Sequence, residues 1–235
     1  MTLKRIILAA ALLSLSAVLG AQEYTPHQGW PLLYENFEKG AARTNNGALV
    51  TEALLNISVL DGSLMYVDSK NTIMKADISK VYTVRIGKDE KEEVYVNIQG
   101  KLYKLISELD LGCVVLGTEV DEDKLSKVDI GYGVSSASGS AMNLTILMDG
   151  RMSVINKSLE QSNEAKFSTP ELPVKHTRYI YTKGYLVPAS RNSVVNFPGV
   201  DKKEAQNFIK QEKIKWKETG SLEKLVIFLN KQLSK

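Results

Sequence analysis

The stretch LLNISVLDGSLMYV, residues 54–67, carries the clearest structural pattern in this chain. Apolar residues alternate with polar ones on both sides of Asp61-Gly62. An Asp-Gly pair between two such runs favours a two-residue type I′ turn, because both turn positions need a positive φ. The stretch predicts a β-hairpin. Since a lone hairpin is marginal in water, further strands or a helix must pack against it.

The position of the turn also predicts the register of the hairpin. The expected pairs are Val59 with Leu64, Ile57 with Tyr66, and Leu55 with Asp68. Opposed residues lie on the same face of a two-stranded sheet. One face is then apolar and must be covered by other parts of the chain: Leu55, Ile57, Val59, Leu64 and Tyr66.

Several shorter stretches also have the composition or the alternation of strands, with turn-forming segments between them. We predict strands at residues 81–86, 94–98, 102–109, 114–116, 178–181 and 185–187. The stretch 102–109 also fits helical spacing, but its neighbours favour a strand. A run of short strands joined by tight turns predicts an antiparallel sheet, a sandwich or a barrel.

The pattern becomes helical near the end of the chain. Ser190 is a candidate N-cap for a short helix, and Asp201 with Glu204 begins a second helix in the manner of a capping box. We expect Ser221 to cap the last helix. The apolar residues of that helix follow the 3.6-residue period closely: Leu222, Leu225, Val226, Leu229 and Leu233.

These patterns together predict an α+β protein in three parts. The parts are a signal peptide at residues 1–21, a β-rich domain at 22–188 with an N-terminal arm and a flexible loop near 119–141, and a small C-terminal helical unit at 189–235.

The first part has the features of a signal peptide. Lys4 and Arg5 precede an apolar run, and Gly20-Ala21 supplies small residues for cleavage before Gln22. The apolar run is short for a membrane span, and we expect no transmembrane segment after its removal. The sequence therefore predicts an exported protein of the periplasm, the outer envelope or the extracellular space.

The composition is that of an ordinary globular protein, with 43% hydrophobic and 24% charged residues. Removal of Lys4 and Arg5 lowers the formal net charge from +3 to about +1, so charge does not indicate a nucleic-acid partner. The single cysteine, Cys113, excludes an intrachain disulfide. We expect it to be buried as a small apolar residue.

The motifs of common catalytic and metal sites do not match this sequence. The acidic residues near 119–123 lack the alternating oxygen ligands and the closing Glu of an EF-hand loop. The Ser- and Gly-rich residues 131–141 complete neither a nucleophile elbow nor a phosphate-binding P-loop. His27 and His176 lie far apart, whereas metal sites usually combine His with Cys or carboxylates at short spacing. We therefore assign no catalytic, cofactor-binding or metal-binding residue.

Four aromatic residues are candidates for contact with a ligand or a partner. Trp30 and Tyr34 either form an aromatic platform or belong to an N-terminal arm that packs its rings into the main domain. Tyr179 and Tyr181 share one face of a predicted strand. They either line a site or pack within the sheet.

Several stretches together resemble a group of uncharacterised exported proteins of Gram-negative bacteria of the Bacteroidota type. The resemblance is carried by Trp30-Pro31, LLNISVLDGSLMYVD (54–68), VYTVRIG (81–87), YIYTKGYLVPASRNSVVNFPG (179–199), FIK-x-x-KI-x-W (208–216) and LEKLVIFLN (222–230). It covers most of the chain after residue 21. The resemblance implies residence in the periplasm or outer envelope, and it brings no activity, ligand or site residue.

The function predicted from these observations is a non-catalytic, binding or structural role in the cell envelope, with an envelope protein or a glycan as partner. An exported hydrolase of glycans or peptides is one alternative, since folding can bring distant carboxylates together. Two acids about 5–10 Å apart in one cleft would favour it. A carbohydrate-binding module that uses the candidate aromatic residues is the other alternative.

Overall fold

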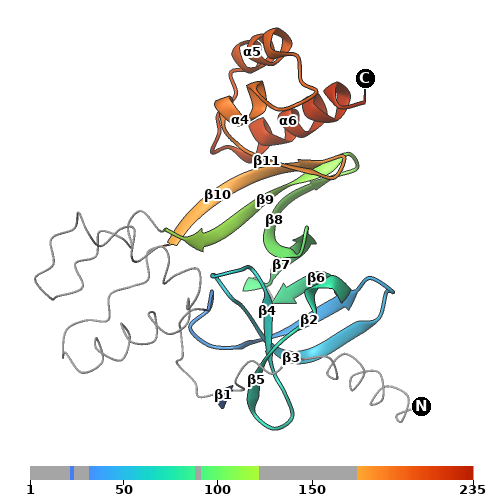
Figure 1. Ribbon diagram of the computed structural model, residues 1–235, viewed down its shortest axis with the longest axis vertical. Coiled ribbons are helices and arrows are strands. Elements are labelled where there is room, and N and C mark those ends of the chain that lie inside the picture. The colour runs from blue at the N-terminus through green and yellow to red at the C-terminus, as the bar shows by residue number, and fades with distance from the viewer. Residues whose placement is uncertain (1–21, 24–31, 88–90, 122–173, 235) are drawn as a thin grey trace, which may run out of the picture. The chain divides into compact units, whose positions relative to one another are not determined.

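The computed structural model describes residues 22–23, 32–87, 91–121 and 174–234 (Figure 1). The described residues up to Glu119 and from His176 onward form one compact unit. Eleven strands in the described part of the chain form a single sheet in the order β1-β5-β4-β3-β2-β6-β7-β8-β9-β10-β11. Every strand pairing that is described is antiparallel. The prediction of an α+β fold with an antiparallel sheet and C-terminal helices is confirmed at this level.

In chain order, the described elements have the following bounds. The strands are β1 (Gln22–Glu23), β2 (Glu38–Thr44), β3 (Leu49–Ile57), β4 (Leu64–Val67), β5 (Thr72–Lys75), β6 (Val81–Ile86), β7 (Glu93–Ile98), β8 (Lys101–Leu109), β9 (Gly112–Val120), β10 (Val174–Thr182) and β11 (Tyr185–Pro188). The helices are the 3-10 helix η1 (Ile78–Lys80), and α4 (Arg191–Val195), α5 (Lys202–Gln211) and α6 (Thr219–Gln232).

The predicted register of the first hairpin is wrong by two residues. β3 and β4 pair Leu55 with Tyr66 and Ile57 with Leu64, not Ile57 with Tyr66. Because side chains alternate with a period of two, this shift keeps every residue on its predicted face. The predicted apolar face is accordingly buried at Leu55, Ile57, Val59 and Leu64 and partly buried at Tyr66.

The connection between these strands explains the shift. The Ser58 N–H donates to the Ser63 carbonyl at 2.9 Å, and the Gly62 N–H donates to the Ser58 carbonyl at 2.9 Å, so four residues form the loop. Gly62 has φ +69°, whereas Asp61 is not among the residues with positive φ. Asp61 Oδ1 instead accepts hydrogen bonds from the backbone N–H and the hydroxyl of Ser63. This side-chain bond favours the longer turn over the type I′ turn.

A two-residue turn with positive φ at both positions occurs in the β10–β11 hairpin. Thr182 pairs with Tyr185, and the two residues between them, Lys183 and Gly184, have φ +51° and +81°. The strands predicted at 178–181 and 185–187 are therefore confirmed, and they pair as a hairpin. The strand prediction over 102–109 is confirmed as well, by β8.

Strands β2–β7, which we call the curled strands, enclose an apolar core (Figure 1). The buried members of this core, to which β8 adds one residue, are Ala42, Leu55, Ile57, Leu64, Val81, Val84, Ile86, Tyr95 and Leu102. Gly40 permits the close approach of β2 to β6, because a Cβ there would lie 2.2 Å from the Arg85 carbonyl oxygen.

The three C-terminal helices begin largely as the sequence predicts. Ser190 Oγ accepts from the Ser193 N–H at the start of α4, and Asp201 Oδ1 accepts from the Glu204 N–H at the start of α5. The cap predicted for α6 is wrong. The helix begins at Thr219, with Glu218 as the N-cap and no side-chain cap bond, so Ser221 already lies in the first turn.

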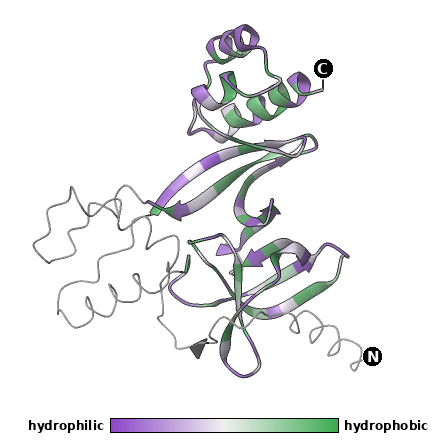
Figure 2. Cartoon of the chain, in the orientation of Figure 1, coloured by the Kyte–Doolittle hydropathy of each residue, from purple (hydrophilic) through white to green (hydrophobic). Residues whose placement is uncertain are grey.

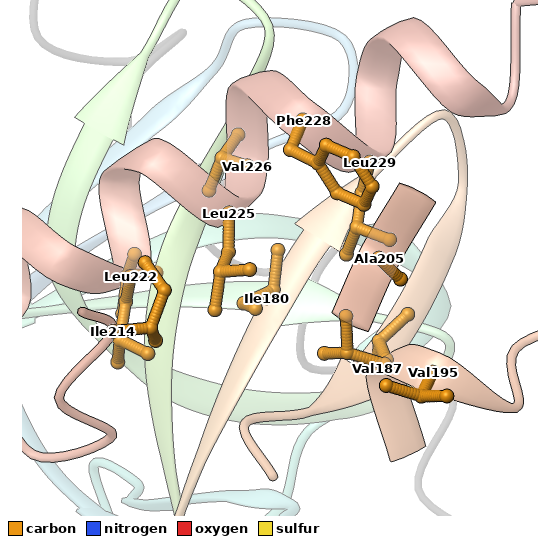
Figure 3. Close-up of a cluster of buried hydrophobic side chains, with 12 residues drawn as sticks. Ile180, Val187, Val195, Ala205, Ile214, Leu222, Leu225, Val226, Phe228 and Leu229 are labelled. Carbon is orange, nitrogen blue, oxygen red and sulfur yellow. The ribbon is translucent and has the colours of Figure 1, made fainter. Parts of the chain in front are cut away.

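The helices pack on the face of β9–β11 that carries Val114, Ile180 and Val187. Figure 3 shows side chains from α6 meeting those of the strands, with Leu225 and Leu229 fully buried. In Figure 2, α6 contains several hydrophobic stretches while α5 is mostly hydrophilic. This agrees with their burial, since α5 buries Ala205 and α6 buries six residues.

The turn between β8 and β9 is tied to β10 and α6. Gly112 has φ +151°, and a Cβ at this position would lie 2.1 Å from the Tyr181 carbonyl oxygen and 3.1 Å from a methyl carbon of Val226. The Leu111 carbonyl accepts from the hydroxyl of Thr182 at 2.7 Å and from the amide of Asn230 at 3.3 Å. Glycine is required where the backbones approach this closely.

Some sequence predictions lie outside the described residues. They are the signal peptide at 1–21, the placement of Trp30, and most of the predicted flexible loop near 119–141. Among the residues that are described, no helix is long and apolar enough to cross a membrane.

Candidate functional site

The candidate site lies where β8 leaves β7. The β7–β8 pairing runs from Ile98 opposite Lys101 to Tyr95 opposite Lys104. From Lys104 onward β8 pairs with β9, and a register irregularity follows between Leu105 and Ser107. Such a bulge bends the strand that carries it. Strands β7 and β8 therefore separate beyond Lys104.

A pocket of about 410 Å³ occupies the space between the parted strands. We call it the wedge pocket, and its walls are residues 91–94 at the start of β7 and residues 104–108 of β8. The volume is within the range of small-molecule sites. Its walls carry charged residues of both signs together with apolar ones: Lys91, Glu92, Glu93, Val94, Lys104, Leu105, Ile106, Ser107 and Glu108.

Glu93 lies at the centre of a polar cluster beside the pocket. One carboxylate oxygen, Oε1, accepts from Lys104 Nζ across the β7–β8 junction. The other, Oε2, accepts from the hydroxyls of Tyr34 at 2.8 Å and Tyr95 at 2.6 Å. The two hydroxyl oxygens lie 2.6 Å apart. Three donors from separate segments of the chain thus converge on one carboxylate.

The pKa values in the cluster follow from burial and these contacts. Partial burial acts to raise the pKa of Glu93, but the hydrogen bonds from Lys104 and the two tyrosines outweigh burial and lower it. Burial, together with the nearby charge of Glu93, raises the pKa of Tyr34 and Tyr95. At neutral pH the carboxylate is therefore ionised and both phenols keep their protons.

Asn56 holds the segment that brings Tyr34 to the cluster. Its side chain is fully buried, its Oδ1 accepts from the Tyr34 N–H at 3.1 Å, and its Nδ2 donates to the carbonyls of Tyr34 and Asn36. Leu33 N–H also donates to the Ile57 carbonyl at 2.8 Å. Tyr34 therefore packs into the domain through its backbone and through its hydroxyl.

Ser107 connects the other wall of the pocket to the helices. Its hydroxyl donates to the Glu223 carboxylate on α6. Ile106 and Leu109 also pack against the helix-covered core. The wall formed by β8 is therefore supported from behind, whereas the wall at Lys91 and Glu92 is exposed.

The structure places the other candidate tyrosines in a separate cluster. Tyr179 and Tyr181 are partly buried on a face with Tyr103, Cys113 and Val115. The rings of Tyr103 and Tyr179 meet edge to face, with centroids 5.6 Å apart and planes at 75°. A Cβ at Gly117 would lie within 3.1 Å of both rings, so glycine leaves room for them.

Sequence reasoning named Tyr34 but missed Glu93, Tyr95 and Lys104. Glu93 falls in a charged stretch that resembles an exposed turn, and it begins β7 instead. Tyr95 lies between Val94 and Val96, and a strand with apolar or aromatic residues at successive positions is usually buried on both faces. This run of three residues could have indicated that Tyr95 is buried. The structure agrees, since Tyr95 is 3% exposed.

The described residues contain no group of three or more His, Cys, Asp or Glu side chains placed to hold a metal ion. Cys113 is buried, and burial with the nearby Glu108 raises the pKa of its thiol to about 11. A thiol with a raised pKa is a weak nucleophile at neutral pH. No protein-family model, curated protein or solved structure matches this chain.

Proposed function

We propose that this chain is an exported, non-catalytic protein of the cell envelope that binds a partner through the wedge pocket. The observation that carries the proposal is the pocket itself, formed where two neighbouring strands part. Export is proposed from the charged, apolar and small-residue pattern of residues 1–21. The resemblance to exported proteins of the Bacteroidota type supports the same location.

The state of Glu93 supports binding over proton transfer. A general acid needs a raised pKa to carry a proton at neutral pH, whereas the contacts of Glu93 lower its pKa. Its charge is matched by Lys104 and by two phenol donors. The cluster therefore ties β7, β8 and the segment of Tyr34 together beside the pocket.

One observation favours the hydrolase alternative as a second candidate. Glu93 and Glu108 both line the wedge pocket. Most glycoside hydrolases use a pair of carboxylates in one cleft as their catalytic residues. A binding protein and a hydrolase differ in what becomes of the ligand, which a direct assay measures.

Location is tested by expressing the full chain in a Gram-negative host and separating the cell fractions. We expect the protein in the periplasmic or envelope fraction, with Gln22 as the first residue by mass spectrometry. A variant that lacks residues 1–21 should remain in the cytoplasm. Recovery of the full chain, unprocessed, in the cytoplasm would contradict the proposed location.

Binding is tested by cosedimentation of the purified chain, residues 22–235, with isolated cell envelopes. We expect Val94→Arg, which fills the pocket, to reduce sedimentation, and Val50→Arg on β3 to leave it unchanged as a matched control. Both valines lie in strands and are partly exposed. Release of sugar or peptide fragments by the native chain, stopped by Glu93→Gln but not by Glu212→Gln, would establish the hydrolase instead.

A further inference from the structure

We propose that the wedge pocket takes an extended polypeptide segment of a partner protein, which adds to β8 as a further strand. The inference rests on the proposed function, because it names the chemical class of the ligand for the same pocket. Every strand has two edges, because backbone N–H and C=O groups point to both sides.

The second half of β8 faces the pocket with one of these edges. Leu105 pairs with Val115 and Glu108 with Cys113, so β9 occupies the other edge. The pairing with β7 covers the first half of β8, up to Lys104. Leu105, Ser107 and Glu108 line the pocket. Backbone groups on this edge are thus placed to pair with an incoming chain, as in other strand-addition sites.

The start of β7 presents a second strand edge from the opposite wall of the pocket. Glu93 pairs with Ile86 and Val94 with Arg85, so β6 occupies the outer edge of β7. The inner edge borders the pocket at the same two residues. An extended segment in the pocket therefore lies between two strand edges, which is the environment of a central strand in a sheet.

The residues of the pocket walls favour a peptide over a sugar. Protein sites that bind sugars or bases commonly stack aromatic rings on the ligand, whereas the lining residues of the wedge pocket include no aromatic side chain. Val94, Leu105 and Ile106 are partly exposed and offer apolar contacts for alternate side chains of a strand.

The pocket also limits the length and the charge of the segment. Residues 105–108 span about 10 Å at the rise of a β-strand, enough for about four residues of an added strand. The lining charges, Lys91 and Lys104 against Glu92, Glu93 and Glu108, nearly cancel. A segment with little net charge and with apolar residues at alternate positions therefore suits the site.

The test begins with a displayed library of random peptides selected on the purified chain, residues 22–235. The peptide that binds best is synthesised, and its backbone is N-methylated at one residue at a time. We expect methylation at every second residue to weaken binding about tenfold, because those N–H groups face the longer edge of β8 and each would lose a hydrogen bond. Methylation at the residues between them, whose N–H groups face only Glu93 and Val94 of β7, should weaken binding less. We also expect slower amide hydrogen exchange at residues 105–108 when the peptide is bound.

Val94→Arg should abolish binding of this peptide, while Val50→Arg should leave it within about twofold of the native value. Methylation that weakens binding without alternation, or a library that yields no peptide sensitive to Val94→Arg, overturns strand addition. Envelope cosedimentation separates the two proposals. If Val94→Arg reduces cosedimentation while strand addition fails, the proposed function stands with a different ligand; if cosedimentation is also unaffected, both fail.

Discussion

The curled strands β2–β7 and the helix-covered strands β8–β11 bury apolar surface in different ways. The curled strands enclose their core with other strands, and polar side chains such as Asn56 and Glu93 tie the segments together. Strands β9–β11 instead bury one face under helices through aliphatic contacts. Buried polar and charged side chains thus supplement the apolar core of the curled strands, whereas the helices are held mainly by apolar packing.

The largest expected effect is on the helix-covered side. Leu225 is fully buried, and Leu225→Ala should lower the free energy of unfolding by about 2–5 kcal/mol, because it removes apolar contacts and leaves a cavity. Ile227 on the same helix is 51% exposed, and Ile227→Ala should cost less than about 0.5 kcal/mol. Denaturant unfolding measures both. Equal losses for the two variants would show that α6 does not pack through the face described.

The next largest effect is expected in the curled strands. Asn56→Ala leaves the Tyr34 N–H and the carbonyls of Tyr34 and Asn36 without their partner, so unfolding should become easier by about 1–3 kcal/mol. Asn45 is exposed, and Asn45→Ala provides the control. Amide hydrogen exchange near Leu33 should speed up in the first variant alone. Unchanged exchange there would break the proposed link between Asn56 and the arm.

A smaller effect tests how the helices begin. Asp201→Ala removes the side-chain acceptor for the Glu204 N–H and should cost about 1 kcal/mol. Ser221→Ala should be nearly neutral, because Ser221 lies inside α6 and does not act as its cap. Thermal unfolding of the two variants compares them directly. A larger loss of stability for Ser221→Ala than for Asp201→Ala would show that Ser221 caps α6, as the sequence predicts.

The smallest effect at neutral pH, and the one that depends on pH, is expected at Glu93. Its folded-state pKa is lowered, so its stabilising contribution is present above the usual glutamate pKa of about 4.3 and is lost as pH falls through the folded-state value. Glu93→Gln should cost less than about 1 kcal/mol at pH 7, because the pair with Lys104 is partly exposed. The difference from the native chain should vanish in acid.

Chemical denaturation of Glu93→Gln and Glu212→Gln at a series of pH values measures this contribution. Among the described residues, carboxyl pKa values are lowered at Asp61, Asp77 and Glu93, all in or between the curled strands. Acid should therefore release amide protection there before it affects α6. Loss of amide protection at the same pH in the curled strands and in α6 would show that the two regions do not differ in their sensitivity to acid.

Local patterns predicted much of the fold. The bounds of β6 coincide with the predicted strand at 81–86, and the caps at Ser190 and Asp201 form as expected. These features depend on residues close in sequence. The first hairpin shows where this fails, since its longer loop contains hydrogen bonds that Ser63 donates to the Asp61 carboxylate, which a simple Asp-Gly rule does not include.

The candidate site was less accessible to sequence reasoning. Tyr34 and Glu93 are 59 positions apart in the chain and meet because β3, β2, β6 and β7 lie in that order across the sheet. The pocket lies where β8 stops pairing with β7 and continues along β9. Strand order and a shift of partners are tertiary properties, and residue alternation does not encode them.

Gly112 has a consequence for how this sequence can change over evolutionary time. The adjacent turn residues, Asp110 and Leu111, are exposed and free to vary, but any side chain at position 112 would collide with the Tyr181 carbonyl. Descendants of this chain that keep the fold should therefore retain glycine there, next to a variable turn. A divergent homologue that keeps this fold but has a bulky residue at that site must have moved β10 away.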